Sequence, residues 1–445
     1  MPLPPGKSEI EVMRHYQYLA SRNFGLDTGM YPLGSCTMKY NPRVNEDLCR
    51  LEGFTALHPA QPIATAQGAL RLMYELAADL AEITGFAATT LAPAAGAHGE
   101  YTALMMFRAA LEARGDARQT VIIPDTAHGT NPATVALCGY KTITVASNEN
   151  GTIDLDALRE VLDTDVAALM LTNPNTLGLF EPDIGKITAM AHDVGAFAYC
   201  DGANLNALMG ITRIAEAGFD ALHINLHKTF AAPHGGGGPG AGPVCVTSEL
   251  APYLPTPVVA LREENYVFET PAHTIGRVRS WYGNFSVLVR AYAYLKALGA
   301  EGLREVSEQA IISANYVRTQ LRDAFDMPYD RPCMHEFVLS GTRQKKESGV
   351  RTLDIAKRLL DYGFHPPTVY FPLIVDECMM IEPTETEPLK TLDAFIEAMR
   401  AIATEASSNP AMLHAAPQTL PVRRLDETAA ARDVVVADLP ATNPS

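Results

Sequence analysis

The sequence predicts an α/β fold, with a large domain built on a mostly parallel β-sheet and a smaller C-terminal α+β domain. Two observations support this prediction. Between residues 121 and 247, short runs of β-type residues alternate with segments of helical period, as strands alternate with crossover helices in such sheets. Beyond residue 300, a helical stretch leads to a second and shorter set of strands and helices.

The first 75 residues are rich in proline, glycine and polar residues, and we expect them to form a long ordered arm. Apolar residues recur at helical spacing over 64–84 and again over 100–113. Between these two helices lies the glycine-containing turn Gly96-Ala97-His98-Gly99. The sequence therefore predicts a glycine-rich turn that opens a helix.

The remaining elements follow in order along the chain. The predicted strands of the large domain are 121–124, 142–146, 166–172, 196–201, 221–226 and 244–247, with helices over 154–162 and 183–194. The expected later elements are helices at 286–298, 301–324, 353–362 and 389–403 and strands at 336–339 and 379–382. We expect an arm (1–75), a large domain (76–300) and a small domain with a tail (301–445).

Composition excludes several classes of function. The chain has 445 residues, and 51 acidic side chains outnumber 35 basic ones, which gives a net charge of −16 and argues against nucleic-acid binding. No run reaches the ~18 apolar residues of a membrane span, and the start resembles no secretory or transit peptide, so we expect a cytoplasmic protein without a membrane partner. Seven scattered cysteines favour neither a disulfide framework nor a metal site.

A lysine and an aspartate stand at the ends of successive predicted strands. Ligands bind beyond the carboxyl ends of strands in open α/β sheets. Burial would favour the neutral amine of Lys228, the form that a Schiff base requires. Asp201 ends the preceding strand, where a carboxylate can keep a pyridine nitrogen protonated. This pair predicts a site for pyridoxal 5'-phosphate.

The other needs of that cofactor also have candidates. The turn of Gly96, Ala97 and His98 precedes a helix, whose N-terminus favours a phosphate. We expect His128 and Ala203 to flank the pyridine ring. We expect Asn175 and Thr176 to contact the cofactor's oxygens. The glycine run 235–238 after the lysine is expected to let the backbone pass close to a ligand.

The stretch 227–240, His-Lys-Thr-Phe-Ala-Ala-Pro-His-Gly-Gly-Gly-Gly-Pro-Gly, resembles the lysine motif of the glycine cleavage P-protein family, the decarboxylating glycine dehydrogenases. Four further segments resemble the same family: 32–39 (Pro-Leu-Gly-Ser-Cys-Thr-Met-Lys), 127–133, 201–207 and 382–385. The similar motifs run from about residue 25 to about residue 425. The resemblance therefore covers nearly the whole chain.

The resemblance implies an aspartate-aminotransferase-like (type I) fold with pyridoxal phosphate on Lys228. The family decarboxylates glycine and passes the aminomethyl group to the lipoyl arm of the H-protein. Some bacterial members are split into two chains, and this one resembles the second, C-terminal chain. The implied partners are therefore subunit 1, in a heterotetramer of two copies of each subunit, and the lipoylated H-protein.

Several assignments stay open at this point. Lys228, once released from the cofactor, or a nearby histidine such as His227 could move protons, and His128 is a third candidate catalytic group. Another type I enzyme, such as an aminotransferase, a cysteine desulfurase or a threonine aldolase, would use the same residues. A third reading is a scaffold subunit that has kept the fold while its partner performs the chemistry.

Overall fold

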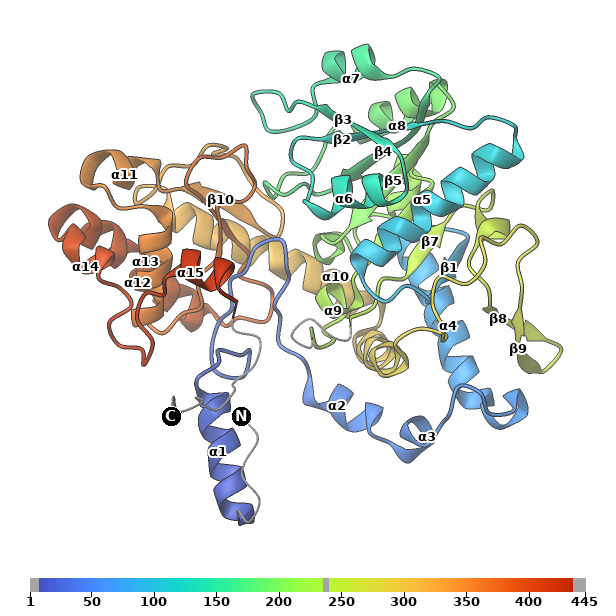
Figure 1. Ribbon diagram of the computed structural model, residues 1–445, viewed down its shortest axis with the longest axis horizontal. Helices are drawn as coiled ribbons and strands as arrows, with labels where there is room; N and C mark the ends of the chain where they lie inside the picture. Colours follow the sequence, from blue (N-terminus) through green and yellow to red (C-terminus); the bar gives the residue numbers. More distant parts are fainter. Residues whose placement is uncertain (1–7, 235–239, 435–445) are drawn as a thin grey trace, which may run out of the picture.

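The computed structural model describes residues 8–234 and 240–434. A unit built on a β-sheet and a smaller C-terminal unit lie side by side, and the long helix α10 (Phe285–Leu321) extends from one to the other (Figure 1). Helix α10 is kinked at Gly299, whose φ of 64° and ψ of −172° suit only glycine. The helices predicted at 286–298 and 301–324 therefore meet at this kink.

Within the described residues, the main sheet has seven strands in the order β1-β7-β6-β5-β4-β2-β3. Strands β3, β2, β4, β5 and β6 are parallel, whereas β7 and β1 are antiparallel to their neighbours. The strand bounds are β1 Ala88–Thr90, β2 Thr120–Pro124, β3 Lys141–Val145, β4 Val166–Thr172, β5 Phe197–Gly202, β6 Ala221–Ile224 and β7 Val244–Val246. The predicted mostly parallel sheet is confirmed, although β1 was not predicted.

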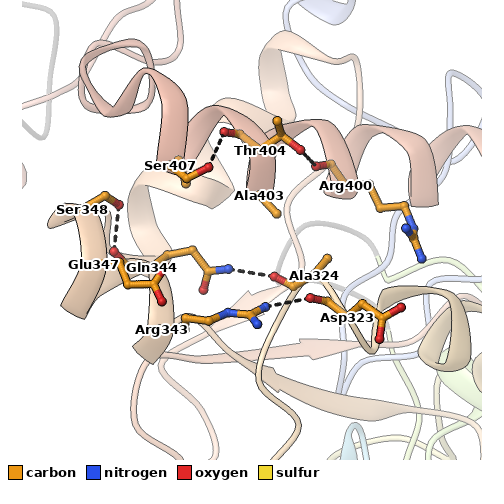
Figure 2. A pocket seen from close by; sticks show the side chains of 11 residues that line it. Asp323, Ala324, Arg343, Gln344, Glu347, Ser348, Arg400, Ala403, Thr404 and Ser407 are labelled. Atoms are coloured by element: carbon orange, nitrogen blue, oxygen red, sulfur yellow. Dashed lines mark hydrogen bonds between the residues drawn. The ribbon is translucent and has the colours of Figure 1, made fainter.

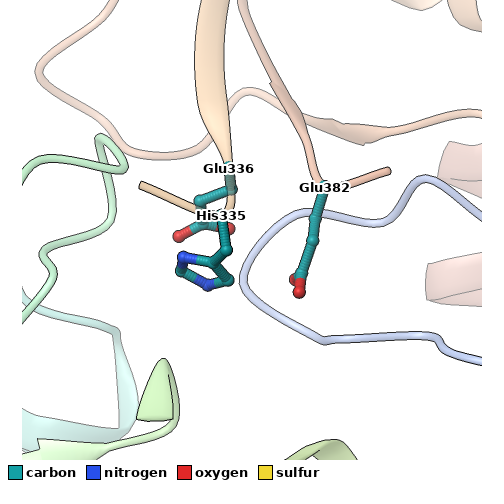
Figure 3. A group of neighbouring side chains, drawn as sticks. All are labelled: His335, Glu336 and Glu382. Carbon is teal, nitrogen blue, oxygen red and sulfur yellow. The ribbon is translucent and has the colours of Figure 1, made fainter. Parts of the chain in front are cut away.

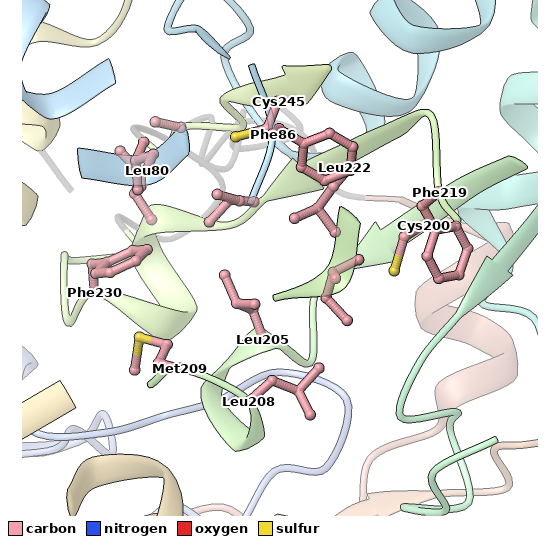
Figure 4. Packing of buried hydrophobic residues seen from close by; sticks show 14 of the residues in the cluster. Leu80, Phe86, Cys200, Leu205, Leu208, Met209, Phe219, Leu222, Phe230 and Cys245 are labelled. Atoms are coloured by element: carbon pink, nitrogen blue, oxygen red, sulfur yellow. The ribbon is translucent and has the colours of Figure 1, made fainter. Parts of the chain in front are cut away.

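Both faces of the sheet are buried, which explains why the central strands are apolar throughout. Every residue of β4 is buried. Tyr199 of β5 packs with the core under α5 (Gly96–Ala113), whereas its neighbour Cys200 belongs to the core on the other face. Figure 4 shows Cys200 in that second core, where Leu222 and Phe219 also pack.

The C-terminal unit is a three-stranded antiparallel sheet with helices packed against it. Its strand order is β10-β12-β11, and Phe337 of β10 lies opposite Ile381 of β12. Its core gathers buried side chains such as Phe325 and Phe395. The bounds are β10 Phe337–Ser340, β11 Thr368–Val369, β12 Cys378–Ile381, α11 Thr342–Ser348, α12 Thr352–Asp361, α13 Leu389–Ser408 and α14 Pro410–His414.

The N-terminal segment, which is expected to form a long ordered arm, contains regular secondary structure. It holds three helices, α1 (Glu9–Ser21), α2 (Arg43–Cys49) and α3 (Glu52–Thr55). Helix α1 has no buried residue and projects away from the rest of the molecule (Figure 1). The capping box at Ser8 gives α1 a local reason to form, because it satisfies backbone N–H groups that no core contact would protect.

The remaining elements complete the covering of the sheet. They are α4 Gln67–Thr84, α6 Thr130–Leu137, α7 Leu155–Val161, α8 Ile184–Asp193, α9 Leu226–Thr229, α15 Glu427–Arg432, β8 Val258–Arg262 and β9 Asn265–Glu269, with short 3-10 helices at Ile63–Thr65, Leu205–Ala207, Ile214–Ala217 and Ala251–Tyr253. Among the helices that the structure describes, we find none with the length and apolarity that crossing a membrane requires.

Candidate functional site

A cavity of about 140 Å³ lies at the carboxyl ends of strands β4, β5 and β6. Chain segments from several parts of the sequence meet there because parallel strands end at the same edge of the sheet. The residues that line it are Ser35, Gly96, Ala97, Glu100, His128, Thr130, Thr172, Thr176, Asp201, Ala203, Asn204, His223, Asn225, His227 and Lys228. Eight of the ten predicted site residues are among them, and His98 and Asn175 are not.

Lys228 is half-buried and reaches the cavity from α9, a single helical turn that follows β6. The sequence places this lysine at the end of the strand predicted at 221–226, but β6 ends earlier, at Ile224. Its Nζ donates a hydrogen bond of 2.7 Å to the backbone carbonyl of Ser35. The amine is thus held between the sheet edge and a loop of the N-terminal segment.

Asp201 lies on β5 and is 2% exposed. Its Oδ1 accepts the backbone N–H of Ala203 at 2.9 Å, and its Oδ2 accepts Nδ2 of Asn131 at 3.1 Å. Burial alone would raise the pKa of Asp201, but His223, 3.5 Å from Oδ1, and these hydrogen bonds outweigh burial and lower it. The carboxylate is therefore ionised, and it shares one cavity with the lysine.

Two further polar residues close to Asp201 were not predicted. Glu100 of α5 accepts the hydroxyls of Thr130 at 2.7 Å and Thr134 at 2.8 Å. Burial and the charge of Asp201 raise the pKa of Glu100. His223 interrupts the apolar run Ala-Leu-His-Ile of β6. That interruption is the signal that could have identified His223, whereas nothing local distinguishes Glu100 from a solvent-exposed helical glutamate.

His128 and Ala203 lie on opposite sides of Asp201 in the chain and both line the cavity. Nδ1 of His128 lies 3.0 Å from the hydroxyl of Thr130, and the backbone N–H of Thr130 donates to it at 3.2 Å. Burial lowers the pKa of His128. The ring is therefore held in a fixed orientation and is neutral at pH 7.

The N-terminus of α5 opens on the cavity through Gly96 and Ala97. The helix begins at Gly96, earlier than predicted, so the glycine turn is its first turn. The first N–H groups of a helix have no acceptor within it. A Cβ at Gly96 would lie 2.5 Å from Nδ2 of Asn225. His98 does not line the cavity, because its Nδ1 accepts the N–H of Ala94 at 3.1 Å.

The loop after β4 supplies one of its two predicted residues. Thr176 lines the cavity, and its hydroxyl donates to the carbonyl of Thr126 at 2.6 Å. Asn175 lies outside the lining, since its side-chain amide is used to shape its own loop. Its Nδ2 donates to the carbonyl of Gly151 at 2.8 Å, and its Oδ1 accepts the N–H of Leu177 at 3.0 Å.

His227 lines the cavity beside Lys228. Burial, and then the neighbouring His234 and Lys228, lower the pKa of His227 to about 3. The rings of His227 and His234 meet edge to face, with centroids 5.1 Å apart. His227 is therefore a neutral imidazole at pH 7. The glycine run 235–238, which was expected to pass close to a ligand, lies outside the described residues.

A larger hollow of about 420 Å³ lies in the C-terminal unit, and Figure 2 shows its lining. It holds none of the predicted site residues. Its two arginines already bond within the protein, Arg343 to the carbonyl of Asp323 at 3.0 Å and Arg400 to the carbonyl of Gln320 at 2.6 Å. The cavity at the sheet edge is the better candidate for chemistry, because it brings an amine, a buried carboxylate and imidazoles together.

Solved structures of known enzymes share this fold. The inhibitor-bound glycine decarboxylase (P-protein) of the glycine cleavage system matches with a TM-score of 0.76 at 21% identity, over 90% of this chain and 91% of that one. Lactobacillus brevis glutamate decarboxylase matches with a TM-score of 0.69 at 13% identity, over 92% and 95%. These likenesses confirm the predicted aspartate-aminotransferase-like (type I) fold.

Comparison with relatives and family models identifies the family. Two relatives carry the name probable glycine dehydrogenase (decarboxylating) subunit 2. The one from Halalkalibacterium halodurans is 59% identical over 97% of this chain and 89% of its own length. The one from Chlorobium chlorochromatii is 58% identical over 97% of this chain and 90% of its own length. The model for the glycine cleavage system P-protein matches residues 1–273, and that for the glycine dehydrogenase C-terminal domain matches residues 306–417. The chain therefore belongs to the glycine cleavage system P-protein family.

Proposed function

We propose that this chain binds pyridoxal 5'-phosphate and decarboxylates glycine, passing the aminomethyl group to the lipoyl arm of the H-protein. The observation that carries the proposal is that Lys228 and the ionised Asp201 face one cavity at the carboxyl edge of a type I sheet. The name of these relatives, glycine dehydrogenase (decarboxylating) subunit 2, supports the substrate and the reaction.

The residues of the cavity fit this cofactor. Lys228 offers an amine for its aldehyde, and Asp201 offers a buried negative charge for its ring nitrogen. The N-terminus of α5 at Gly96 offers N–H groups to its phosphate, and an added Cβ there would obstruct the space. The hydroxyl of Thr172, which lines the cavity, has no partner among the described residues. An uncommitted buried donor of this kind suits a polar ligand.

When bound, pyridoxal phosphate supplies an electron-withdrawing ring that accepts the electron pair left when glycine loses carbon dioxide. Asp201 keeps the ring nitrogen protonated, and its own hydrogen bonds and His223 keep the carboxylate ionised for that role. Lys228 would hold the cofactor through its amine. The same amine would be positioned to move a proton at the reacting carbon.

The imidazoles have different roles in this proposal. His128 is fixed by Thr130 and would flank the ring of the cofactor. His227 is neutral at pH 7, so it adds no positive charge to the cavity beside Lys228. We assign the proton transfer to Lys228 because His227, with its strongly lowered pKa, is the weaker base.

The chain acts with other proteins in this proposal. The relatives' name denotes one subunit of a divided enzyme, so we infer a partner, P-protein subunit 1, in a heterotetramer of two copies of each. The lipoylated H-protein is the acceptor of the aminomethyl group.

The proposal is tested by reconstitution. The chain is purified alone, with subunit 1, and with subunit 1 plus lipoylated H-protein, and release of carbon dioxide from carboxyl-labelled glycine is measured. We expect release in the complete mixture and its loss in a mixture carrying Lys228→Ala. A mixture that instead exchanges amino groups with a keto acid, or that stays active with Lys228→Ala, would support an aminotransferase or a scaffold subunit.

A further inference from the structure

Two glutamates lie opposite each other where neighbouring strands of the C-terminal sheet end. Phe337 of β10 pairs with Ile381 of β12, and Glu336 precedes the first of these residues while Glu382 follows the second. In an antiparallel pair this register places their side chains as cross-strand neighbours. Glu336 is 0% and Glu382 1% exposed, and Figure 3 shows them on either side of the N-terminal loop. Neither belongs to the mechanism described above.

Glu336 bonds to two loops that reach the active-site cavity. Its Oε2 accepts the backbone N–H of Ser35 at 2.7 Å, and its Oε1 accepts Nδ2 of Asn204 at 3.2 Å. Both of these partners line the cavity. One carboxylate of the C-terminal unit therefore ties together the N-terminal loop and the loop that follows Asp201.

Ser35 connects Glu336 to Lys228 through two backbone hydrogen bonds. Its φ is 65°, in the left-handed region that costs a non-glycine residue conformational free energy. Such a conformation persists only where surrounding contacts enforce it, and the Glu336 bond to its N–H is one such contact. On its other side, the carbonyl of Ser35 accepts Nζ of Lys228 at 2.7 Å. The position of Ser35 thus determines where the amine stands.

The rest of this loop is attached to the C-terminal unit in a similar way. The hydroxyl of Thr37 donates to Oε1 of Glu382 at 2.6 Å. The buried ammonium of Lys39 pairs with Glu385 at 2.8 Å. The neighbouring Gly34 is also held, because its carbonyl accepts the hydroxyl of Thr368 at 2.7 Å and its N–H donates to the carbonyl of Met380 at 3.2 Å. Among the described residues of the C-terminal unit, Glu336 is the one that bonds to Ser35 itself.

We propose that Glu336 is a positioning residue for the reaction: by holding Ser35 in its left-handed conformation, it places the Ser35 carbonyl on the amine of Lys228. The inference rests on the proposed function, because Lys228 is the amine that the cofactor needs. It concerns geometry rather than charge. A side chain at position 336 that keeps an acceptor oxygen at the same reach should therefore keep Ser35 and the Lys228 amine in place, and a shorter side chain should not.

The same group of side chains is poorly suited to bind a metal ion. His335, Glu336 and Glu382 could offer three ligand atoms within 4.8 Å of one another. Both oxygens of Glu336 and one of Glu382 already accept hydrogen bonds. Within the described residues, this leaves two of the three side chains with uncommitted ligand atoms, fewer than the four or more that Zn²⁺ or Ca²⁺ takes from its surroundings.

The test compares two variants that separate reach from charge. Glu336→Gln keeps an oxygen at the same reach for the N–H of Ser35 but loses the charge and the acceptor for Asn204, whereas Glu336→Asp keeps the charge but withdraws it by one methylene. The matched controls are the same changes at Glu377, which accepts the N–H of Thr352 at 2.9 Å at the other end of β12. All proteins are freed of cofactor and exposed briefly to an amine-acetylating reagent, and labelling of Lys228 is measured by mass spectrometry.

We expect Lys228 to be labelled roughly tenfold faster in Glu336→Asp, the change that follows when a buried N–H loses its hydrogen-bond acceptor. Glu336→Gln and both Glu377 variants should stay within about twofold of the parent. Parent-like labelling in Glu336→Asp, faster labelling in Glu336→Gln alone, or a divalent metal that copurifies and disappears with either variant would overturn the proposal. A failure to decarboxylate glycine would refute the proposed function but leave this result unchanged, since neither cofactor nor substrate is present.

A second measurement uses the enzyme loaded with cofactor. In the reconstituted system, Glu336→Asp should lower kcat by about tenfold or more while KM for glycine changes little. A misplaced Lys228 amine slows the chemical reaction but does not weaken the binding of glycine. The absorbance band of the bound cofactor should shift in Glu336→Asp but not in Glu336→Gln. A loss of kcat without a spectral shift, or equal losses in both variants, would point to a general structural role and contradict the positioning role.

Discussion

Replacement of Asp201 separates the electrostatic role of this residue from its structural one. In Asp201→Ala, the N–H of Ala203 and the amide of Asn131 lose their buried acceptor. Each unsatisfied buried donor costs about 1–3 kcal/mol, so the free energy of unfolding should fall by about 2–6 kcal/mol. Asp201→Asn should cost about 1 kcal/mol. Oδ1 of Asn131 has no partner among the described residues, so its amide can turn over and accept the new donor.

The two variants should nevertheless lose similar amounts of activity. Both lack the carboxylate that would keep the ring nitrogen of the cofactor protonated. A hydrogen bond to a charged group contributes about 1.5–3 kcal/mol, and its loss from the transition state slows a reaction by roughly 10- to 150-fold. The rate should therefore fall to this extent in Asp201→Asn, although the fold is nearly as stable as in the parent.

The assay combines denaturant unfolding with carbon dioxide release from labelled glycine, in the presence of subunit 1 and lipoylated H-protein. Cofactor is kept saturating, so that weaker binding does not imitate a slower reaction. An Asp201→Asn protein within twofold of the parent rate would refute the role of the carboxylate at the ring. Equal destabilisation by both variants would refute the hydrogen-bond argument.

Two further predictions concern stability. Gly178→Ala should lower the free energy of unfolding by about 1–3 kcal/mol more than Gly349→Ala. Both glycines have a φ of +75°, but only a Cβ at Gly178 would lie against the backbone oxygen of Glu336. Equal unfolding midpoints for the two variants would contradict this. A hydrogen bond to Asp220 raises the pKa of His192. The stability that this interaction contributes is therefore complete below the pKa of about 6.5 in the unfolded chain, and it is lost as the pH rises through the pKa in the folded protein. His192→Gln should therefore lower stability more at about pH 5.5 than at about pH 8, and a pH-independent difference would contradict the linkage.

Most of the fold was predictable because its central strands are short apolar runs between helices of clear period. The run 166–172 is β4 to the residue, since both of its faces are buried. Strand β1 and the hairpin of β8 and β9 were missed because β1 has only three residues and the hairpin is partly exposed, which weakens the apolar signal. The division of the chain at residues 75 and 300 stays a prediction.

The candidate site was predictable where chemistry follows a strand end. Lys228 and Asp201 were found because each comes directly after an apolar run. Asn175 lies outside the cavity lining, and nothing in the sequence shows that an asparagine after a cis proline will use its amide within its own loop. Ser35 and Glu336 belong to segments about 300 residues apart, and their contact arises only when the C-terminal unit packs against the N-terminal loop.

The most direct measurement of the central claim is the location of the cofactor on the chain. The purified protein is saturated with pyridoxal 5'-phosphate, reduced with borohydride, digested and mapped by mass spectrometry. We expect one modified lysine, Lys228, and no covalent adduct in Lys228→Ala. A modification at any other lysine, or an unmodified Lys228 in protein that retains the cofactor's colour, would contradict the account.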